Sequence, residues 1–300
     1  KNFLKLIYIT LMRRVHFQLF GGVRFGGTLT VDDAWRYGFD HLALAVGAGL
    51  PKELSIPNSL VPGMRQANDF LMALQLTGAA KENSVAPLQI RLPAVVIGGG
   101  LTGVDTATEV QAYYIKQITK VDHQYNALLR ESNAKEIRSG FSKEQLVLLD
   151  EWLAHAQELK SERQKAQASG DELDIISLVR RWGGVSIVYR QRMQKSPAYR
   201  LNHEELSQAL REGIYYRERH QPLEVLVDQD GHASVLRCVL TSENEKGSSV
   251  PTQEHVDIPA KSILVATGAK PNVAYAFEHK DTFNRERFEY QSFQLEQDQL

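Results

Sequence analysis

The stretch 93–109, PAVVIGGGLTGVDTATE, constrains the fold of this chain more than any other segment. A β-forming run at 95–97 is followed by Gly98, Gly100 and Gly103, and then by residues that favour a helix. A strand that turns into a helix through G-x-G-x-x-G is typical of a βαβ unit that binds a dinucleotide. Gly98 permits the tight turn, Gly100 lets a pyrophosphate approach the backbone, and Gly103 lets the helix pack closely on the strand.

The helix after this turn predicts where the phosphates of a ligand would lie. The first N–H groups of a helix have no partner within the helix, and its dipole favours negative charge at that end. We therefore assign the pyrophosphate to Gly98, Gly100, Thr102 and Gly103. The alternative interpretation of the same residues is a glycine-rich strand–helix turn that binds no ligand.

The overall composition excludes several functional classes. A net charge of −1 over 300 residues argues against a nucleic-acid-binding surface as the main function. Cys238 is the single cysteine, so this chain has no disulfide framework, iron–sulfur ligand set or CxxC pair of its own, and it fits the reducing cytoplasm. No apolar run is long enough to span a membrane. The histidines show no metal-ligand spacing and the paired acids lie at predicted helix starts, so we expect neither a metal site nor a catalytic triad.

The N-terminal third predicts short elements separated by loops. We expect a helix at 2–11, a strand at 15–19, a short helix capped by Thr30, an apolar strand at 41–49 and a helix at 63–76. An irregular polar stretch then leads to the strand at 95–97. The chain does not begin with methionine, so we expect it to begin inside a larger natural protein.

After the glycine turn, the sequence predicts a helical insertion at about 112–180. A second strand should follow the first within about thirty residues, but the next convincing strand is at 185–190. Ser142 and Gln145 form a capping-box pattern before an apolar helical repeat. The insertion either projects as an arm that docks a partner or buries its own apolar residues against the domain.

The C-terminal half predicts one more helix and a β-meander. Asn202 is expected to cap a helix that reaches about Arg211. Two runs of alternating residues flank Asp230-Gly231, which is a strong hairpin signal, and a polar loop is expected at 242–253. Two further strands are expected within 255–268.

An ordered set of segments resembles a known family. The segments are 14–49, SIPN at 55–58, 98–109, 185–192, 196–214 and ILVATGAKPN at 263–272. Together they resemble the two-dinucleotide-domain flavoproteins of the pyridine nucleotide-disulfide oxidoreductase superfamily, and within them the small chain of glutamate synthase and its relatives. Three apolar runs end in glycine, and the outer two match the crossovers between the flavin and nicotinamide domains of that family.

The resemblance implies an α/β fold. It implies a Rossmann-like NAD(P)H-binding domain at 93–260, with its helical insertion and β-meander, inserted into a partial FAD-binding domain formed by 1–92 and 261–300. The family's first GxGxxG and its closing Gly-Asp segment are not in this sequence, so we expect FAD in the full-length protein and not necessarily in this chain. The full protein would pass hydride from NADPH to FAD, and electrons onward to a partner domain or an iron–sulfur chain. We expect no catalytic side chain, because the cofactors carry such a reaction.

The end of the second strand indicates which nicotinamide nucleotide is used. An NAD site usually has an acid there to accept from the ribose 2′-OH, but this strand ends in Tyr-Arg-Gln-Arg. Arg190 and Arg192 suit a 2′-phosphate, so we favour NADPH over NADH; alternatively they are an ordinary solvated strand end. As a further hypothesis from the resemblance, Gly47 and Thr267 lie where the crossovers approach the cofactors.

Two other functional classes remain as alternatives. The chain could be a non-catalytic binding or assembly module, with a vestigial nucleotide site and an insertion that docks a partner. A stand-alone NAD-dependent dehydrogenase is the weaker alternative, because the sequence lacks a Tyr-x-x-x-Lys pair after the glycine turn and the acid that binds the ribose.

Overall fold

The computed structural model describes residues 2–271, 285–286 and 289–290. It divides into two compact units, one formed by 1–50 with 270–300 and the other by 51–269. Each unit is described by itself. Among the described residues, no helix combines the length and the apolarity that a membrane crossing requires.

The larger unit is built on a five-stranded parallel sheet in the order β2-β9-β3-β4-β5. All four residues of β3 and all four of β9 are buried, as expected for parallel strands covered on both faces. The strand predicted at 95–97 is therefore confirmed. The five strands are β2 (Met64–Gln66), β3 (Ala94–Ile97), β4 (Val185–Tyr189), β5 (Tyr215–Glu218) and β9 (Ser262–Val265).

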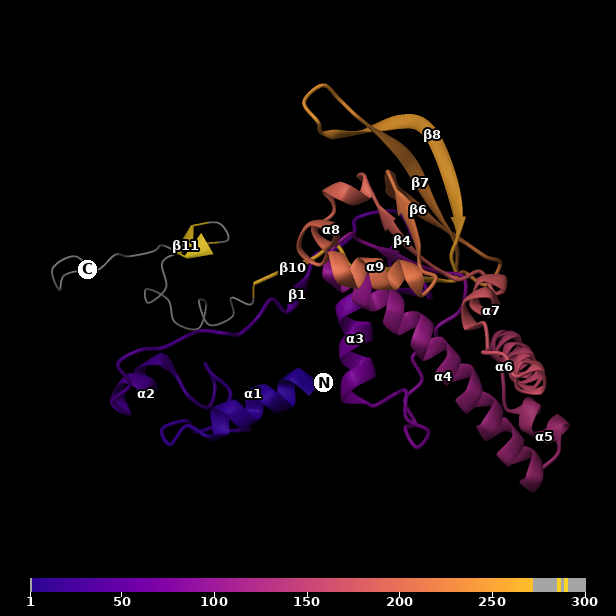
Figure 1. The fold of residues 1–300 in the computed structure, drawn as a ribbon, viewed down its shortest axis with the longest axis horizontal. Helices are drawn as coiled ribbons and strands as arrows, with labels where there is room; N and C mark the ends of the chain where they lie inside the picture. The colour runs from indigo at the N-terminus through magenta and orange to yellow at the C-terminus, as the bar shows by residue number, and fades with distance from the viewer. Residues whose placement is uncertain (1, 272–284, 287–288, 291–300) are drawn as a thin grey trace. The chain divides into compact units, whose positions relative to one another are not determined.

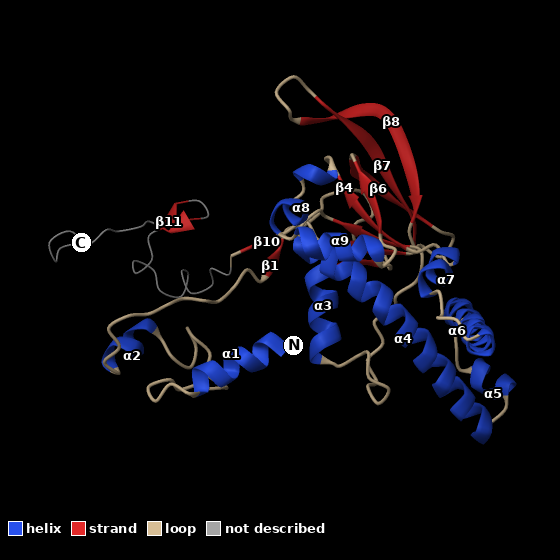
Figure 2. Cartoon of the chain, in the orientation of Figure 1, coloured by secondary structure: helices blue, strands red, loops and turns tan. Residues whose placement is uncertain are grey.

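Alternate residues of the sheet face two different layers. Val96 and Ile187 belong to a core shared with the helices, whereas Val95 and Val188 belong to a second core shared with a three-stranded antiparallel sheet. The helices that contribute to the first core are α3 (Ala67–Leu76), α4 (Leu101–Glu131), α6 (Lys143–Ser169), α7 (Ile175–Arg181), α8 (Pro197–Leu201) and α9 (His203–Arg211). Figure 2 distinguishes these helices from the strands. The predicted α/β fold class with a parallel, Rossmann-like sheet is confirmed.

The antiparallel sheet is the predicted β-meander. It contains β6 (His220–Val227), β7 (Ala233–Glu243) and β8 (Ser249–Pro259), and the turn at Asp230-Gly231 joins the first two. The loop predicted at 242–253 is wrong in extent, because Glu243 pairs with Ser249 and the strands continue to that point. Cross-strand pairing therefore overrides the polar composition that suggested a loop.

The insertion is helical, as predicted, and its inner part packs against the domain. Helix α4 runs without a break from the glycine turn to Glu131, and α6 lies beside it (Figure 1). Tyr114 on α4 and Trp152 on α6 lie in the same core as the sheet. The outer part is different, since helix α5 (Ala134–Ser139) buries no residue. The structure therefore favours an insertion that buries its apolar residues, with an exposed tip.

A polar cluster fixes the insertion to the chain segments that enter β3 and β9. Glu151 on α6 accepts from Arg91 at 2.8 Å and from Lys261 at 2.7 Å. Nearby, Tyr114 and the Nδ1 atom of His155 are 2.5 Å apart, and the imidazole is stacked on the Trp182 ring. These contacts lie before the strands begin, so they support the domain from its amino-terminal side.

The elements of the smaller unit agree less well with those predicted from the sequence. Helix α1 (Asn2–Met12) and helix α2 (Val31–Arg36), with its Thr30 capping box, are confirmed. The strands predicted at 15–19 and 41–49 are wrong, because these residues have no ladder of hydrogen bonds. An extended chain needs a neighbouring strand to satisfy its backbone groups. The remaining pieces are the antiparallel pair β11 (Arg285–Glu286) and β12 (Glu289–Tyr290).

Two-residue strands mark where the chain passes between the units. These are β1 (Leu50–Pro51) and β10 (Ala269–Lys270). The parallel sheet of the larger unit includes β2 and β9, which the sequence analysis assigned to the flavin-domain segments. The predicted domain limits at 92/93 and 260/261 stay a prediction. The tail beyond residue 272, apart from β11 and β12, lies outside the described residues.

Candidate functional site

The candidate site is at the carboxyl edge of the parallel sheet. Ile97 of β3 pairs with Val265 of β9 on one side and with Val188 of β4 on the other. The three strands therefore end together, and the segments that follow them lie at the same edge. Ligands of open α/β sheets bind outside the carboxyl ends of the strands.

The glycine turn is closely packed at its first and third glycines. Gly98 has a φ of +144°, and a β-carbon there would lie 2.2 Å from the carbonyl oxygen of Ala266. A β-carbon on Gly103 would lie 2.3 Å from the carbonyl oxygen of Gly98. Both positions therefore require glycine for the fold itself, independently of any ligand.

The middle glycine faces open space. A β-carbon on Gly100 would meet nothing within 4 Å, and the residue has an ordinary extended conformation with φ −90° and ψ 174°. Gly100 is also the N-cap of α4 and has no side chain to cap it. Space for a ligand and uncapped N–H groups therefore occur at the same place, next to the half-buried Thr102. These residues fit a pyrophosphate.

A fourth glycine was not identified from the sequence. A β-carbon on Gly99 would lie 2.6 Å from the Cδ2 atom of Tyr189, whose ring therefore covers the turn from the end of β4. The carbonyl oxygen of Gly99 accepts from the N–H of Ala198 at 3.0 Å, which holds α8 against the turn. The available signal was three consecutive glycines, of which the motif needs only two.

Arg190 and Arg192 follow β4 at this edge, and both are exposed. The carbonyl oxygen of Arg190 accepts from the hydroxyls of Thr241 at 2.6 Å and Ser249 at 2.9 Å, so the antiparallel sheet holds its backbone. The Nε atom of Arg192 lies 3.6 Å from the Oε1 atom of Glu243. Sequence reasoning missed Glu243, because it lies fifty residues further along the chain.

Thr267 and Gly47, the two residues predicted to lie at the crossovers, have different surroundings. Thr267 follows β9, and its hydroxyl donates to the carbonyl oxygen of Lys52 at 3.1 Å. It therefore lies at the carboxyl edge with the glycine turn. Gly47 belongs to the smaller unit and has a φ of +70°. A β-carbon added to it would meet no atom within 4 Å. The assignment of both residues to cofactor contacts stays a prediction.

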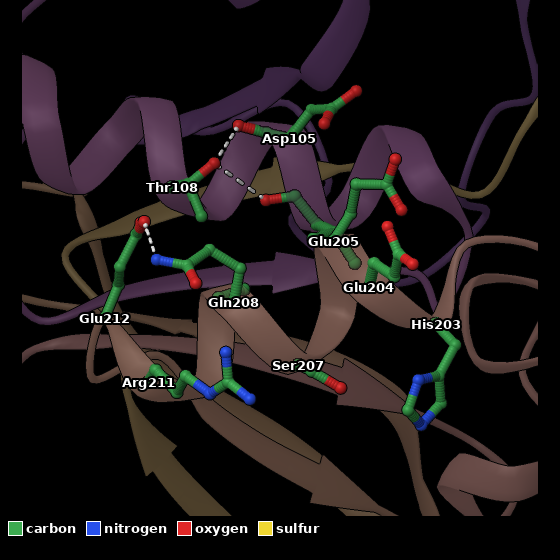
Figure 3. Close-up of a pocket in the computed structure, with 11 residues that line it drawn as sticks. Asp105, Thr108, His203, Glu204, Glu205, Ser207, Gln208, Arg211 and Glu212 are labelled. Atoms are coloured by element: carbon green, nitrogen blue, oxygen red, sulfur yellow. Dashed lines mark hydrogen bonds between the residues drawn. The ribbon is translucent and has the colours of Figure 1, made fainter.

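A separate groove of about 640 Å³ lies between α4 and α9 (Figure 3). The carboxylates of Asp105, Glu204 and Glu205 gather at one end of it. Burial, and then the nearby carboxylates of Glu205 and Glu109, raise the pKa of Asp105. This acidic lining is unsuited to phosphates, and the glycines of the turn do not line the groove. Within the described part of the chain, no group of three or more His, Cys, Asp or Glu side chains could hold a metal ion.

A comparison with protein-family models decides the family. The model described as pyridine nucleotide-disulphide oxidoreductase matches residues 10–290. The chain belongs to the pyridine nucleotide-disulphide oxidoreductase family. The superfamily that the sequence resembles is thereby confirmed.

Relatives of this family member include one protein of clear sequence similarity. It is an uncharacterized protein of Rickettsia prowazekii (strain Madrid E), which is 33% identical over 294 residues. The match covers 94% of this chain and 39% of the relative. This chain therefore spans well under half the length of that relative.

Solved structures with the same fold include FprA of Mycobacterium tuberculosis in complex with NADPH. That structure has a TM-score of 0.52 and 15% identity, and the match covers 90% of this chain and 58% of FprA. A second FprA structure, which reveals a covalent modification of NADP⁺, has the same TM-score and coverage at 14% identity. At these identities the likeness shows a shared fold.

Proposed function

We propose that this chain is the NADPH-binding part of a flavoprotein oxidoreductase similar to the small chain of glutamate synthase. The observation that carries the proposal is the open space at Gly100, where an uncapped helix N-terminus meets the carboxyl edge of a parallel sheet. Membership of the pyridine nucleotide-disulphide oxidoreductase family supports it. The NADPH complex of FprA, which shares the fold, is consistent with it.

Each residue of the site has a role in this proposal. Gly98 and Gly103 shape the turn, while Gly100 and the N–H group of Thr102 receive the pyrophosphate. The guanidinium groups of Arg190 and Arg192 bind the 2′-phosphate, which an arginine can grip with two hydrogen bonds. Thr267 and Gly47 lie on the crossover segments and contact the cofactors from there.

The proposal for the whole protein extends beyond this chain. When bound, NADPH would supply a hydride for FAD in a complete flavin domain, and electrons would then pass to a partner domain or an iron–sulfur chain. The part played by this chain is to bind and orient the nucleotide. We place the protein in the cytoplasm, in keeping with its single cysteine.

The double variant Arg190→Ala/Arg192→Ala tests the nucleotide preference. We expect NADP⁺ to bind at least about tenfold more weakly, because hydrogen bonds between charged groups contribute roughly 1.5–3 kcal/mol each. The affinity for NAD⁺, which has no 2′-phosphate, should change little. Calorimetric titration of the double variant and of the wild-type chain with both nucleotides measures this. An unchanged preference would show that the two arginines do not bind the 2′-phosphate.

The exposed tip of the insertion favours a second candidate, an assembly module. Leu128 is 48% exposed and Leu129 is 37% exposed at the end of α4, and the helix α5 that follows buries no residue. Such a tip suits contact with a partner protein. Under this alternative the folded chain binds neither nucleotide, and charged substitutions at Leu128 and Leu129 abolish partner capture. Nucleotide binding by the unmodified chain would favour the first proposal.

A further inference from the structure

We propose that Arg219 and Lys195 complete the binding site for the 2′-phosphate of the nucleotide, and that Glu243 is an internal counter-ion which this phosphate displaces. The inference rests on the proposed function, since it concerns the same nucleotide. It adds two cations and one carboxylate to that proposal. Lys195 lies shortly after β4, Arg219 follows β5, and Glu243 is the last residue of β7.

Arg219 lies at the same edge of the sheet as the arginines already assigned. Strand β5 is parallel to β4, and Glu218 at its end pairs with Tyr189 at the end of β4. Arg219 is the next residue, so β4 and β5 end side by side with an arginine directly after each. The ribose of a dinucleotide lies at the end of the second strand of a Rossmann unit, which here is β4.

The backbone of Arg219 is held in an uncommon conformation. Its φ is +61°, in the left-handed region, where a residue other than glycine costs roughly 1–2 kcal/mol. Two hydrogen bonds fix it there. Its N–H donates to the carbonyl oxygen of Gln191 at 3.0 Å, and its carbonyl oxygen accepts from the N–H of Thr241 at 2.9 Å. Such strained residues concentrate at binding sites. Arg219 lines the same small hollow as Arg192 and Lys195, which follow β4.

Glu243 fills the space between the cations. Its carboxylate lies 3.1 Å from the Nζ atom of Lys195 and 3.6 Å from the Nε atom of Arg192. The hollow lined by these residues and Arg219 has a volume of about 10 Å³, which is room for about one water molecule. Glu243 therefore occupies the position between Lys195 and Arg192 that a phosphate bound to both cations would take.

The charges at this place favour that exchange. The hydrogen bond from Lys195, together with the charges of Lys195, Arg192 and Arg219, lowers the pKa of Glu243, so it is ionised at neutral pH. The ion pairs it forms are partly exposed, and pairs of this kind contribute little. A phosphate monoester carries more charge and more acceptor oxygens than one carboxylate. The other acid at this edge, Glu218, is already engaged with the N–H of Met193 at 2.9 Å.

The test compares two probes that differ in the 2′-phosphate, adenosine 2′,5′-bisphosphate and adenosine 5′-monophosphate. Calorimetry on the full chain gives the ratio of their dissociation constants. We expect Arg219→Asn, which tolerates the left-handed backbone, to weaken binding of the bisphosphate about tenfold. We expect Glu243→Gln to strengthen it several-fold, because the competing charge is removed. Binding of the monophosphate should stay the same in both variants.

Glu245→Gln is the matched control. It makes the same charge change on the same β7–β8 hairpin, in the exposed loop, and should leave the ratio unchanged. If Glu243→Gln and Arg219→Asn leave the ratio at the wild-type value, while Arg190→Ala/Arg192→Ala weakens binding of the bisphosphate relative to the monophosphate, this inference is wrong and the proposed function stands. Equal binding of the two probes by the wild-type chain overturns the NADPH assignment itself, and this inference with it.

Discussion

Gly100→Ala should weaken NADP⁺ binding at least about tenfold while the chain stays folded. The new methyl group meets nothing within 4 Å in the free chain, and the φ of −90° suits alanine. Alanine is a poorer N-cap than glycine, so the free energy of unfolding should fall by less than about 1 kcal/mol. The methyl group would, however, occupy the space through which the pyrophosphate reaches the helix N-terminus. Calorimetric titration and urea unfolding of the same preparation measure both effects.

Gly103→Ala is the matched comparison in the same turn. Its methyl group would lie 2.3 Å from the carbonyl oxygen of Gly98, which cannot move without opening the contact between helix and strand. We expect a loss of roughly 3 kcal/mol or more in the free energy of unfolding, and loss of nucleotide binding as a consequence. If Gly100→Ala binds NADP⁺ as tightly as the wild type, the pyrophosphate does not lie at this turn.

Glu151→Ala should destabilise the chain by roughly 3 kcal/mol at neutral pH. The Glu151 side chain is 13% exposed and Arg91 is 14% exposed, so the substitution leaves a largely buried guanidinium without its partner. Removing one member of a buried ion pair typically costs about 3–5 kcal/mol, and the partial exposure of Lys261 lowers the expected value. Asp150→Ala is the control, because Asp150 is adjacent to Glu151 in the sequence but forms an exposed ion pair with Arg138. This substitution should lower the free energy of unfolding by less than about 1 kcal/mol. Equal losses in the two variants would contradict a structural role for the buried cluster.

This ion cluster also predicts a pH dependence of stability. Burial by itself raises the pKa of Glu151, but the hydrogen bonds from Arg91 and Lys261 outweigh it, and the pKa is lowered below its usual value of 4.5. A lowered pKa stabilises the folded state above about pH 4.5, and this contribution is lost as the pH falls through the folded-state pKa. The unfolding free energy of Glu151→Ala should therefore fall less steeply on acidification than that of the wild type.

The parts of the fold that the sequence predicted correctly depend on local patterns. The strand and helix around Gly98, the helices of the insertion and the hairpin at Asp230-Gly231 each follow from residues close together in the chain. The prediction of strands at 15–19 and 41–49 was wrong, because an apolar run forms a strand only where another strand pairs with it. The extent of β7 and β8 was missed for the related reason that pairing between distant residues extends them.

In the candidate site, as in the fold, only the features that depend on neighbouring residues could be predicted from the sequence. The packing of Gly98 and Gly103 agrees with the roles that the motif gives to them, since both roles arise within six residues. The position of Arg219 beside the end of β4 depends on strand order. The pairing of Glu243 with Arg192 depends on the β7–β8 hairpin. Neither contact has a local signal in the sequence, so only the folded chain reveals them.

Calorimetric titration of the folded chain with NADP⁺ and NAD⁺ tests the central claim most directly. We predict saturable binding of both nucleotides, with NADP⁺ the tighter ligand. We also predict that the difference in affinity depends on Arg190 and Arg192. Failure of a folded preparation to bind either nucleotide would contradict the account and favour the assembly module.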